Sequence, residues 1–114
     1  MEDPDAMTIS ANELQQELAR TEATMIQVMR RAGRGTDPEF NRRLERHARC
    51  LRAMLDADGL VVAMDTLDAA RRAMDAADPA APLLMLAMSR ENLAAVVRRQ
   101  ASRSAERHAE FLVR

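Results

Sequence analysis

The chain has 114 residues, a formal net charge of −1 and 47% hydrophobic residues, a composition typical of one globular domain rather than of a disordered segment. Aromatic residues make up only 2%, so the sequence offers few surfaces on which the bases of single-stranded nucleic acid could stack. The single cysteine excludes an internal disulfide, and the polar N-terminal residues are unlike a signal peptide. We therefore expect a cytoplasmic protein, and the use of Arg without any Lys favours a bacterial one with a GC-rich genome.

The N-terminal third predicts a short tail followed by a helix. Residues 1–9 contain three acids and a proline, which predicts a flexible acidic tail in front of a single helical domain over residues 10–114. Ser10 with Glu13 matches a capping box at a helix start. Apolar residues then recur every three or four positions up to Gly33, which predicts a helix over residues 10–32.

Two further helices are expected in the middle of the chain. Asp37 followed by Pro38 is a strong helix start, and the apolar seam that follows predicts a helix over residues 38–57. Gly59 is placed where a glycine often ends a helix. A third helix is predicted over residues 60–77.

The last predicted helix covers residues 79–113, capped by Asp78, and is either long and continuous or kinked near Ser89. It would measure roughly 50 Å against about 36 Å for the first helix. The short connections favour an all-α, antiparallel up-and-down bundle of about four helices. Because the first helix is too short to cover the last one, we expect the last helix to meet a partner.

The expected partner-binding surface lies on that last helix. Leu93 and Val97 lie one turn apart on an apolar seam, and Arg99, Arg103 and Arg107 follow at intervals of four residues. The nine methionines give an adaptable apolar surface, which suits a helical or partly unfolded protein partner. We interpret the protein as a non-catalytic interaction module, such as a small adaptor, chaperone or inhibitor, that also forms a homodimer.

A metal-binding or metal-sensing bundle is the alternative hypothesis. His47 and Cys50 share one helix face, and His108 would join them if the second and fourth helices were adjacent. Three donors are fewer than a structural zinc site normally has. The competing interpretation, that each histidine is a partly buried seam residue bonded to a carbonyl or a carboxylate, is favoured, so no metal or cofactor is expected.

The remaining functional classes have little support in the sequence. A nucleic-acid-associated regulator would use the same arginine stripe, but Asp65, Asp68 and Asp75 would repel DNA from the third helix. Cys50 and His47 have no glycine-rich loop or sheet edge that could supply an oxyanion hole, and the sequence has no phosphate-binding glycine loop, so an enzyme is not expected. The longest apolar stretch, residues 80–88, is too short to span a membrane.

Overall fold

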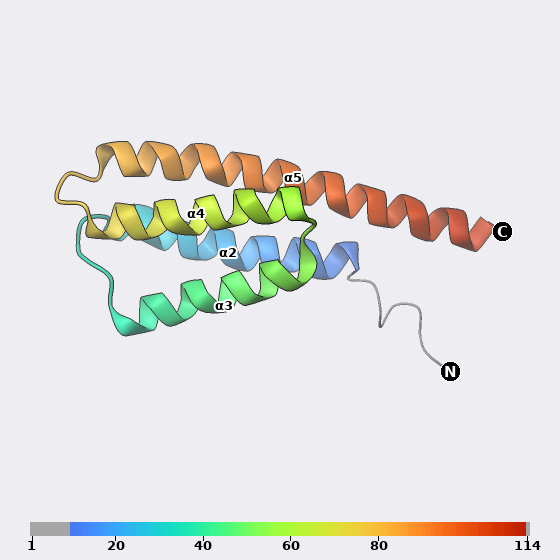
Figure 1. Cartoon of the computed structure of the whole chain (residues 1–114), viewed down its shortest axis with the longest axis horizontal. Helices are drawn as coiled ribbons and strands as arrows, with labels where there is room; N and C mark the ends of the chain where they lie inside the picture. Colours follow the sequence, from blue (N-terminus) through green and yellow to red (C-terminus); the bar gives the residue numbers. More distant parts are fainter. Residues whose placement is uncertain (1–9, 114) are drawn as a thin grey trace.

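The structure is a computed structural model that describes residues 10–113, with side chains as far as Arg107. Over that range the chain forms four α-helices and no strand: α2 (Ala11–Arg31), α3 (Pro38–Met54), α4 (Ala57–Asp75) and α5 (Ala80–Val113). Each helix runs antiparallel to the one before it (Figure 1). The predicted all-α, up-and-down bundle is therefore confirmed, and the predicted tail over residues 1–9 lies outside the described residues.

Three helix starts are fixed by the capping residues that the sequence predicts. The Ser10 hydroxyl accepts a hydrogen bond from the Glu13 amide at 3.0 Å, and the Asp37 carboxylate accepts one from the Phe40 amide at 2.7 Å. Asp78 accepts one from the Ala80 amide at 3.2 Å. Each bond satisfies a backbone N–H that has no partner within its own helix, so short polar side chains define where these helices begin.

The predicted boundary at Gly59 is wrong. α3 ends at Met54 and α4 begins at Ala57, which places Gly59 inside the first turn of α4. Its backbone does not adopt a positive φ, unlike Gly33 and Gly35. A Cβ atom at Gly59 would lie 2.7 Å from the Cγ1 atom of Val96 on α5. The glycine is therefore used for the close approach of two helices and not to end one.

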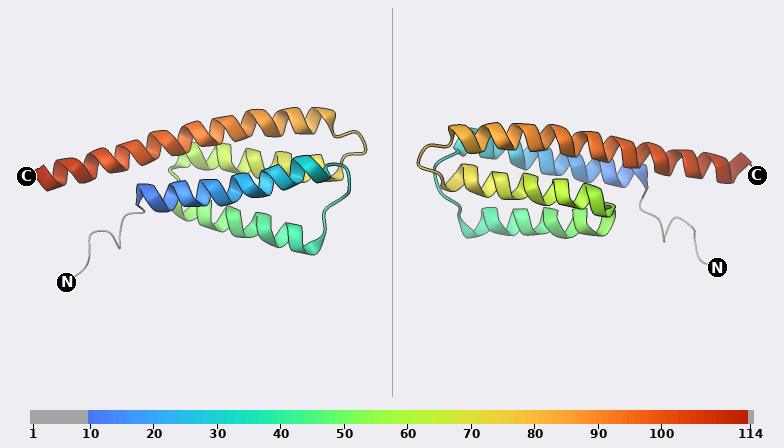
Figure 2. Two further views of the ribbon diagram at one scale, coloured as in Figure 1. Left: turned by 180° about the vertical axis from the view of Figure 1, so that it is seen from behind. Right: turned by 45° about the horizontal axis from the view of Figure 1, so that its top comes forward.

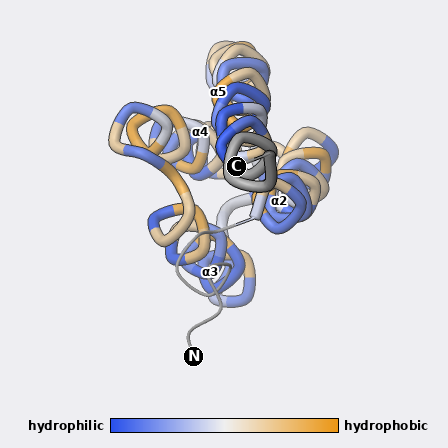
Figure 3. The backbone as a smooth tube through the Cα atoms, turned by 90° about the vertical axis from the view of Figure 1, so that its right-hand side faces the viewer, coloured by the Kyte–Doolittle hydropathy of each residue, from blue (hydrophilic) through white to orange (hydrophobic). Residues whose placement is uncertain are grey.

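The four helices occupy the corners of a bundle in which α3 lies diagonally opposite α5 (Figure 3). The core has two apolar clusters, one near each end. The first includes Met25, Leu44, Leu67 and Leu86, and the second includes Leu14, Leu51, Leu93 and Val97. α4 contributes mainly small residues to these clusters, so that α5 packs closely against it.

The last helix is longer than its neighbours, as the sequence predicts, and of the two forms that the sequence left open it takes the continuous one through Ser89. At about 1.5 Å per residue, the 34 residues of α5 span about 51 Å, against about 32 Å for the 21 residues of α2. Arg103 of α5 already lies at the turn between α3 and α4, where it contacts Asp56. The helix therefore continues past the ends of the other three (Figures 1 and 2).

Candidate functional site

The outer face of α5 carries a cluster of exposed apolar side chains. Leu84, Met85 and Met88 are 63%, 54% and 59% exposed, and Ala81 beside them is also exposed. Their spacing of three and four residues places them on neighbouring turns of one side of the helix. We call Ala81, Leu84, Met85 and Met88 the outer face. Since Leu86 of the same segment is completely buried, this part of α5 is apolar on opposite sides.

No comparable cluster occurs elsewhere among the described side chains. The other large apolar residues that are strongly exposed are Ile26 on α2 and Val61 on α4, at 41% and 62%. Each belongs to a different helix, and single exposed apolar residues are ordinary on protein surfaces. The outer face differs because three large side chains share one side of one helix. This makes it the best candidate for a docking surface.

The predicted docking residues Leu93 and Val97 belong to the core. Both side chains are 0% exposed and pack in the cluster that contains Leu14, Leu51 and Ala63. The spacing correctly placed them on an apolar seam. A seam alone does not show whether it is covered by other helices of the same chain or by a partner. α2 and α4 cover it here, so neither side chain is accessible to a partner.

The predicted arginine stripe is on the surface. Arg99, Arg103 and Arg107 are all exposed. Arg103 forms an ion pair with Asp56 at 3.0 Å, in which both side chains are more than half exposed, so solvent weakens it. Gln100, which lies between Arg99 and Arg103 in the sequence, is buried. Its side chain donates to the Met54 carbonyl at 2.7 Å and accepts from the Asp56 amide at 3.0 Å. This glutamine joins α5 to the turn between α3 and α4.

His47 is bonded on both ring nitrogens inside the bundle. Nδ1 lies 3.0 Å from a carboxylate oxygen of Glu17, and because a carboxylate only accepts, Nδ1 donates. Nε2 lies 2.8 Å from the hydroxyl of Thr24. Glu17 is 2% exposed and is also contacted by Arg20 at 3.3 Å. The interpretation of His47 as a buried seam residue bonded to a carboxylate is therefore confirmed, with Glu17 as a partner that the sequence had not indicated.

The structure does not assemble the predicted metal ligands. Cys50 is half-buried on α3, but α3 and α5 occupy opposite corners, so the adjacency that His108 required is missing. The side chain of His108 lies outside the described part of the chain. Within that part, no group of three His, Cys, Asp or Glu side chains is arranged to hold a metal ion.

One helix in the described range is long and apolar enough to cross a membrane, namely the segment Ala80–Arg107 of α5. This segment is longer than the unbroken apolar stretch over residues 80–88, because α5 continues beyond that stretch with further apolar residues. Only 17% of this window is buried inside the bundle, and a single helix that passes by length and composition is weak evidence of a membrane span. Leu86, Leu93 and Val97 are enclosed by the bundle, and Arg90 pairs with Glu22 of α2 at 3.4 Å. The expected cytoplasmic location and the absence of a membrane contact stay predictions.

Comparison with protein-family models, with curated proteins and with solved structures finds no match to this chain. We therefore infer the function from the geometry of the chain itself. The sequence did contain a signal for the outer face: the apolar run through residues 80–88 is too continuous to fit on one side of a helix.

Proposed function

We propose that the protein is a non-catalytic protein-interaction module in which the outer face of α5 docks the same face of a second copy. The observation that supports this is the exposure of Leu84, Met85 and Met88, each more than half accessible, on adjoining turns. Covering these side chains removes apolar surface from water, which is the main driving force of association. Met is flexible enough to fill the gaps between two such faces.

The charges at the two ends of the outer face favour an antiparallel pair. Asp78 lies just before α5 and Arg99 lies about six turns further along the chain, and both are exposed. If two α5 helices cross antiparallel near Met88, Arg99 of each copy lies beside Asp78 of the other. A parallel pair would instead bring each Arg99 beside its own equivalent, and like charges repel. Parallel and antiparallel pairs can both have the two-fold symmetry of most homodimers, so the charges are what favour the antiparallel pair.

The size of the face predicts a weak dimer. Three large side chains from each copy amount to less than the roughly 1,200 Å² of total buried area at which stable interfaces begin. The expected dissociation constant is therefore in the range of about 1 to 100 μM. An interaction of this strength also allows exchange with a helical partner of similar apolar character.

The test is the mass in solution measured by sedimentation equilibrium over a wide concentration range. The unchanged protein should pass from monomer to dimer, and L84E combined with M88E should remain a monomer with the same helical content. V61E is the matched control, because Val61 is as exposed as Leu84 but lies on α4. A monomer at every concentration, or dimerisation of the double variant as strong as that of the unchanged protein, would contradict the proposal.

Charge reversal tests the orientation. R99E should weaken the dimer, and adding D78K should restore part of the lost affinity because the pair is re-formed with opposite signs. Arg98 is also exposed but lies on another side of α5, so R98E serves as the control. Equal weakening by R98E and R99E, or further weakening when D78K is added, would contradict the antiparallel arrangement.

A further inference from the structure

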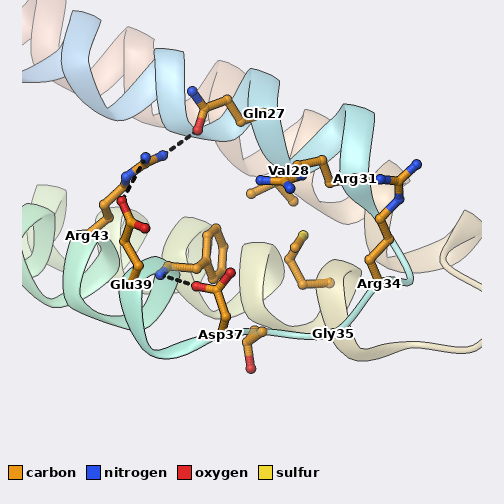
Figure 4. A pocket seen from close by; sticks show the side chains of 11 residues that line it. Gln27, Val28, Arg31, Arg34, Gly35, Asp37, Glu39 and Arg43 are labelled. Atoms are coloured by element: carbon orange, nitrogen blue, oxygen red, sulfur yellow. Dashed lines mark hydrogen bonds and ion pairs between the residues drawn. The ribbon is translucent and has the colours of Figure 1, made fainter.

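A pocket of about 200 Å³ lies between the end of α2 and the start of α3. Figure 4 shows arginines on both of its sides: Arg43 from α3 on one, and Arg31 and Arg34 from α2 and the following loop on the other. It is far from the outer face of α5 in the sequence and uses none of its residues. A volume of this size suits a small molecule better than a peptide segment.

The loop that forms one wall of the pocket is held in place by α4. The amides of Gly33 and Gly35 donate to the carbonyls of Ala73 and Met74 at 2.9 and 2.7 Å. These bonds satisfy carbonyls at the end of α4 that would otherwise lack partners. Both glycines have a positive φ, +82° and +85°, a conformation that other residues rarely adopt. The loop is therefore fixed before any ligand arrives, which lowers the entropy lost on binding.

Positive charge in the pocket exceeds negative charge. Both nearby carboxylates are already engaged: Glu39 pairs with Arg43 at 3.4 Å, and Asp37 accepts the bond that caps α3. Arg31 and Arg34 line the same pocket, and their guanidinium groups form no ion pair with any other described residue. Three arginines against two acids leave one net positive charge, which suits a ligand with a single negative charge.

Apolar side chains form the inner part of the pocket. Val28 and Met74 are buried, and Phe40 is half-exposed. Of these side chains, Figure 4 shows Val28 between the arginines that border the opening. A ligand that reaches them must therefore carry an apolar group as well as its charge.

We propose that this pocket binds a small organic carboxylate that carries a short apolar or aromatic group. The carboxylate lies against Arg31 and Arg34, because the planar guanidinium group matches the two oxygens of a carboxylate. The apolar group lies against Phe40. A phosphate dianion is less suitable, because the nearby carboxylates of Asp37 and Glu39 would repel its second charge.

The test is a titration of isotope-labelled protein followed by the amide NMR signals of Gly35 and Phe40. With 3-phenylpropionate these signals should shift and saturate with a dissociation constant of about 1 mM. Acetate has the same charged group without the ring, and 3-phenylpropylamine has the ring with the opposite charge. Acetate should bind at least about tenfold more weakly, and the amine should not shift these signals. No saturable shift, or equal binding of acetate or inorganic phosphate, would overturn the proposal.

A pair of neighbouring arginines supplies the matched variants. R34Q should weaken 3-phenylpropionate binding about tenfold, since a charged hydrogen bond becomes a neutral one. Arg30 is an exposed arginine next to Arg31 on α2 that does not line the pocket, so R30Q should leave the affinity unchanged. Equal losses in R30Q and R34Q would mean that only general charge attraction is measured, which would also overturn the proposal.

Discussion

The α4–α5 and α2–α3 pairs of neighbouring helices are held together in different ways. α4 and α5 meet through buried Gly59 and a run of buried alanines, and no polar side chain mediates that approach at Gly59. α2 and α3 meet around the buried group of Glu17, Thr24 and His47. Figure 1 shows α2 and α3 diverging toward the loop that joins them, and the pocket lies at that wider end.

Side-chain size and polarity divide this bundle into two kinds of contact. Small residues let helix backbones approach closely, so α5 is firmly seated and its opposite side is left to face water. A buried polar group instead requires specific partners at specific positions, which fixes the position of α3 against α2. The pocket lies beyond this buried group, toward the wider end of the α2–α3 pair. The two proposed binding surfaces follow from these two arrangements.

The largest expected effect comes from removing apolar volume between α5 and its neighbours. Leu93 is completely buried, so L93A should lower the free energy of unfolding by about 3 kcal/mol through lost burial and a cavity. The matched variant L84A removes the same atoms from an exposed position and should change it by less than about 0.5 kcal/mol. Chemical denaturation measures both values. Similar losses in the two variants would show that α5 is not seated as described.

A smaller loss is expected when the polar contact between α2 and α3 is broken. E17L removes the acceptor of the His47 ring N–H and should destabilise the protein by about 2 kcal/mol, because a buried donor is left without a partner. Replacing both residues, as E17L with H47L, should recover part of that loss, since Thr24 keeps its contact with the Arg20 carbonyl. Denaturation of both single variants and the double variant gives the coupling energy. Purely additive losses would contradict a direct pairing.

The sequence predicted the fold well because helix starts and apolar seams are local signals. Ser10, Asp37 and Asp78 cap helices by bonds that reach only two or three residues along the chain. Glu17 could not be identified in the same way, since its main partner, His47, is 30 residues away and only the packing of α3 on α2 brings them together. The same holds for Gln100, whose bonds reach back more than 40 residues.

The candidate docking surface was harder to predict for a related reason. Leu93, Val97, Leu84 and Met88 are all apolar residues of one helix, and spacing assigns them to sides without saying which side the bundle covers. α2 and α4 decide which side is covered, and spacing alone does not predict how these two helices pack against α5. Gly59 illustrates the same limit: a glycine near a helix end is ambiguous until the neighbouring helix is placed.

The close approach at Gly59 is tested by whether G59A raises or lowers the free energy of unfolding, a smaller change than the two above. Alanine is a better helix former than glycine by about 1 kcal/mol, so G59A should be stabilising if local preference decided the outcome. Its Cβ atom would instead lie 2.7 Å from a methyl group of Val96, whose branched side chain has little freedom to move within α5. We therefore expect G59A to lower the free energy of unfolding by about 1 kcal/mol.

V96A removes the methyl group that the new Cβ atom would meet. Introduced into that background, G59A should become neutral or stabilising by up to about 1 kcal/mol, because the remaining tight contact, with Leu55 Cδ2 at 3.3 Å, involves the end of a flexible side chain that can move aside. Thermal and chemical denaturation of the four proteins in this cycle measure the reversal. G59A could instead be equally destabilising with Val or Ala at position 96. In that case Gly59 and Val96 do not limit how closely α4 and α5 approach, which would contradict the contrast drawn with the polar contact of α2 and α3.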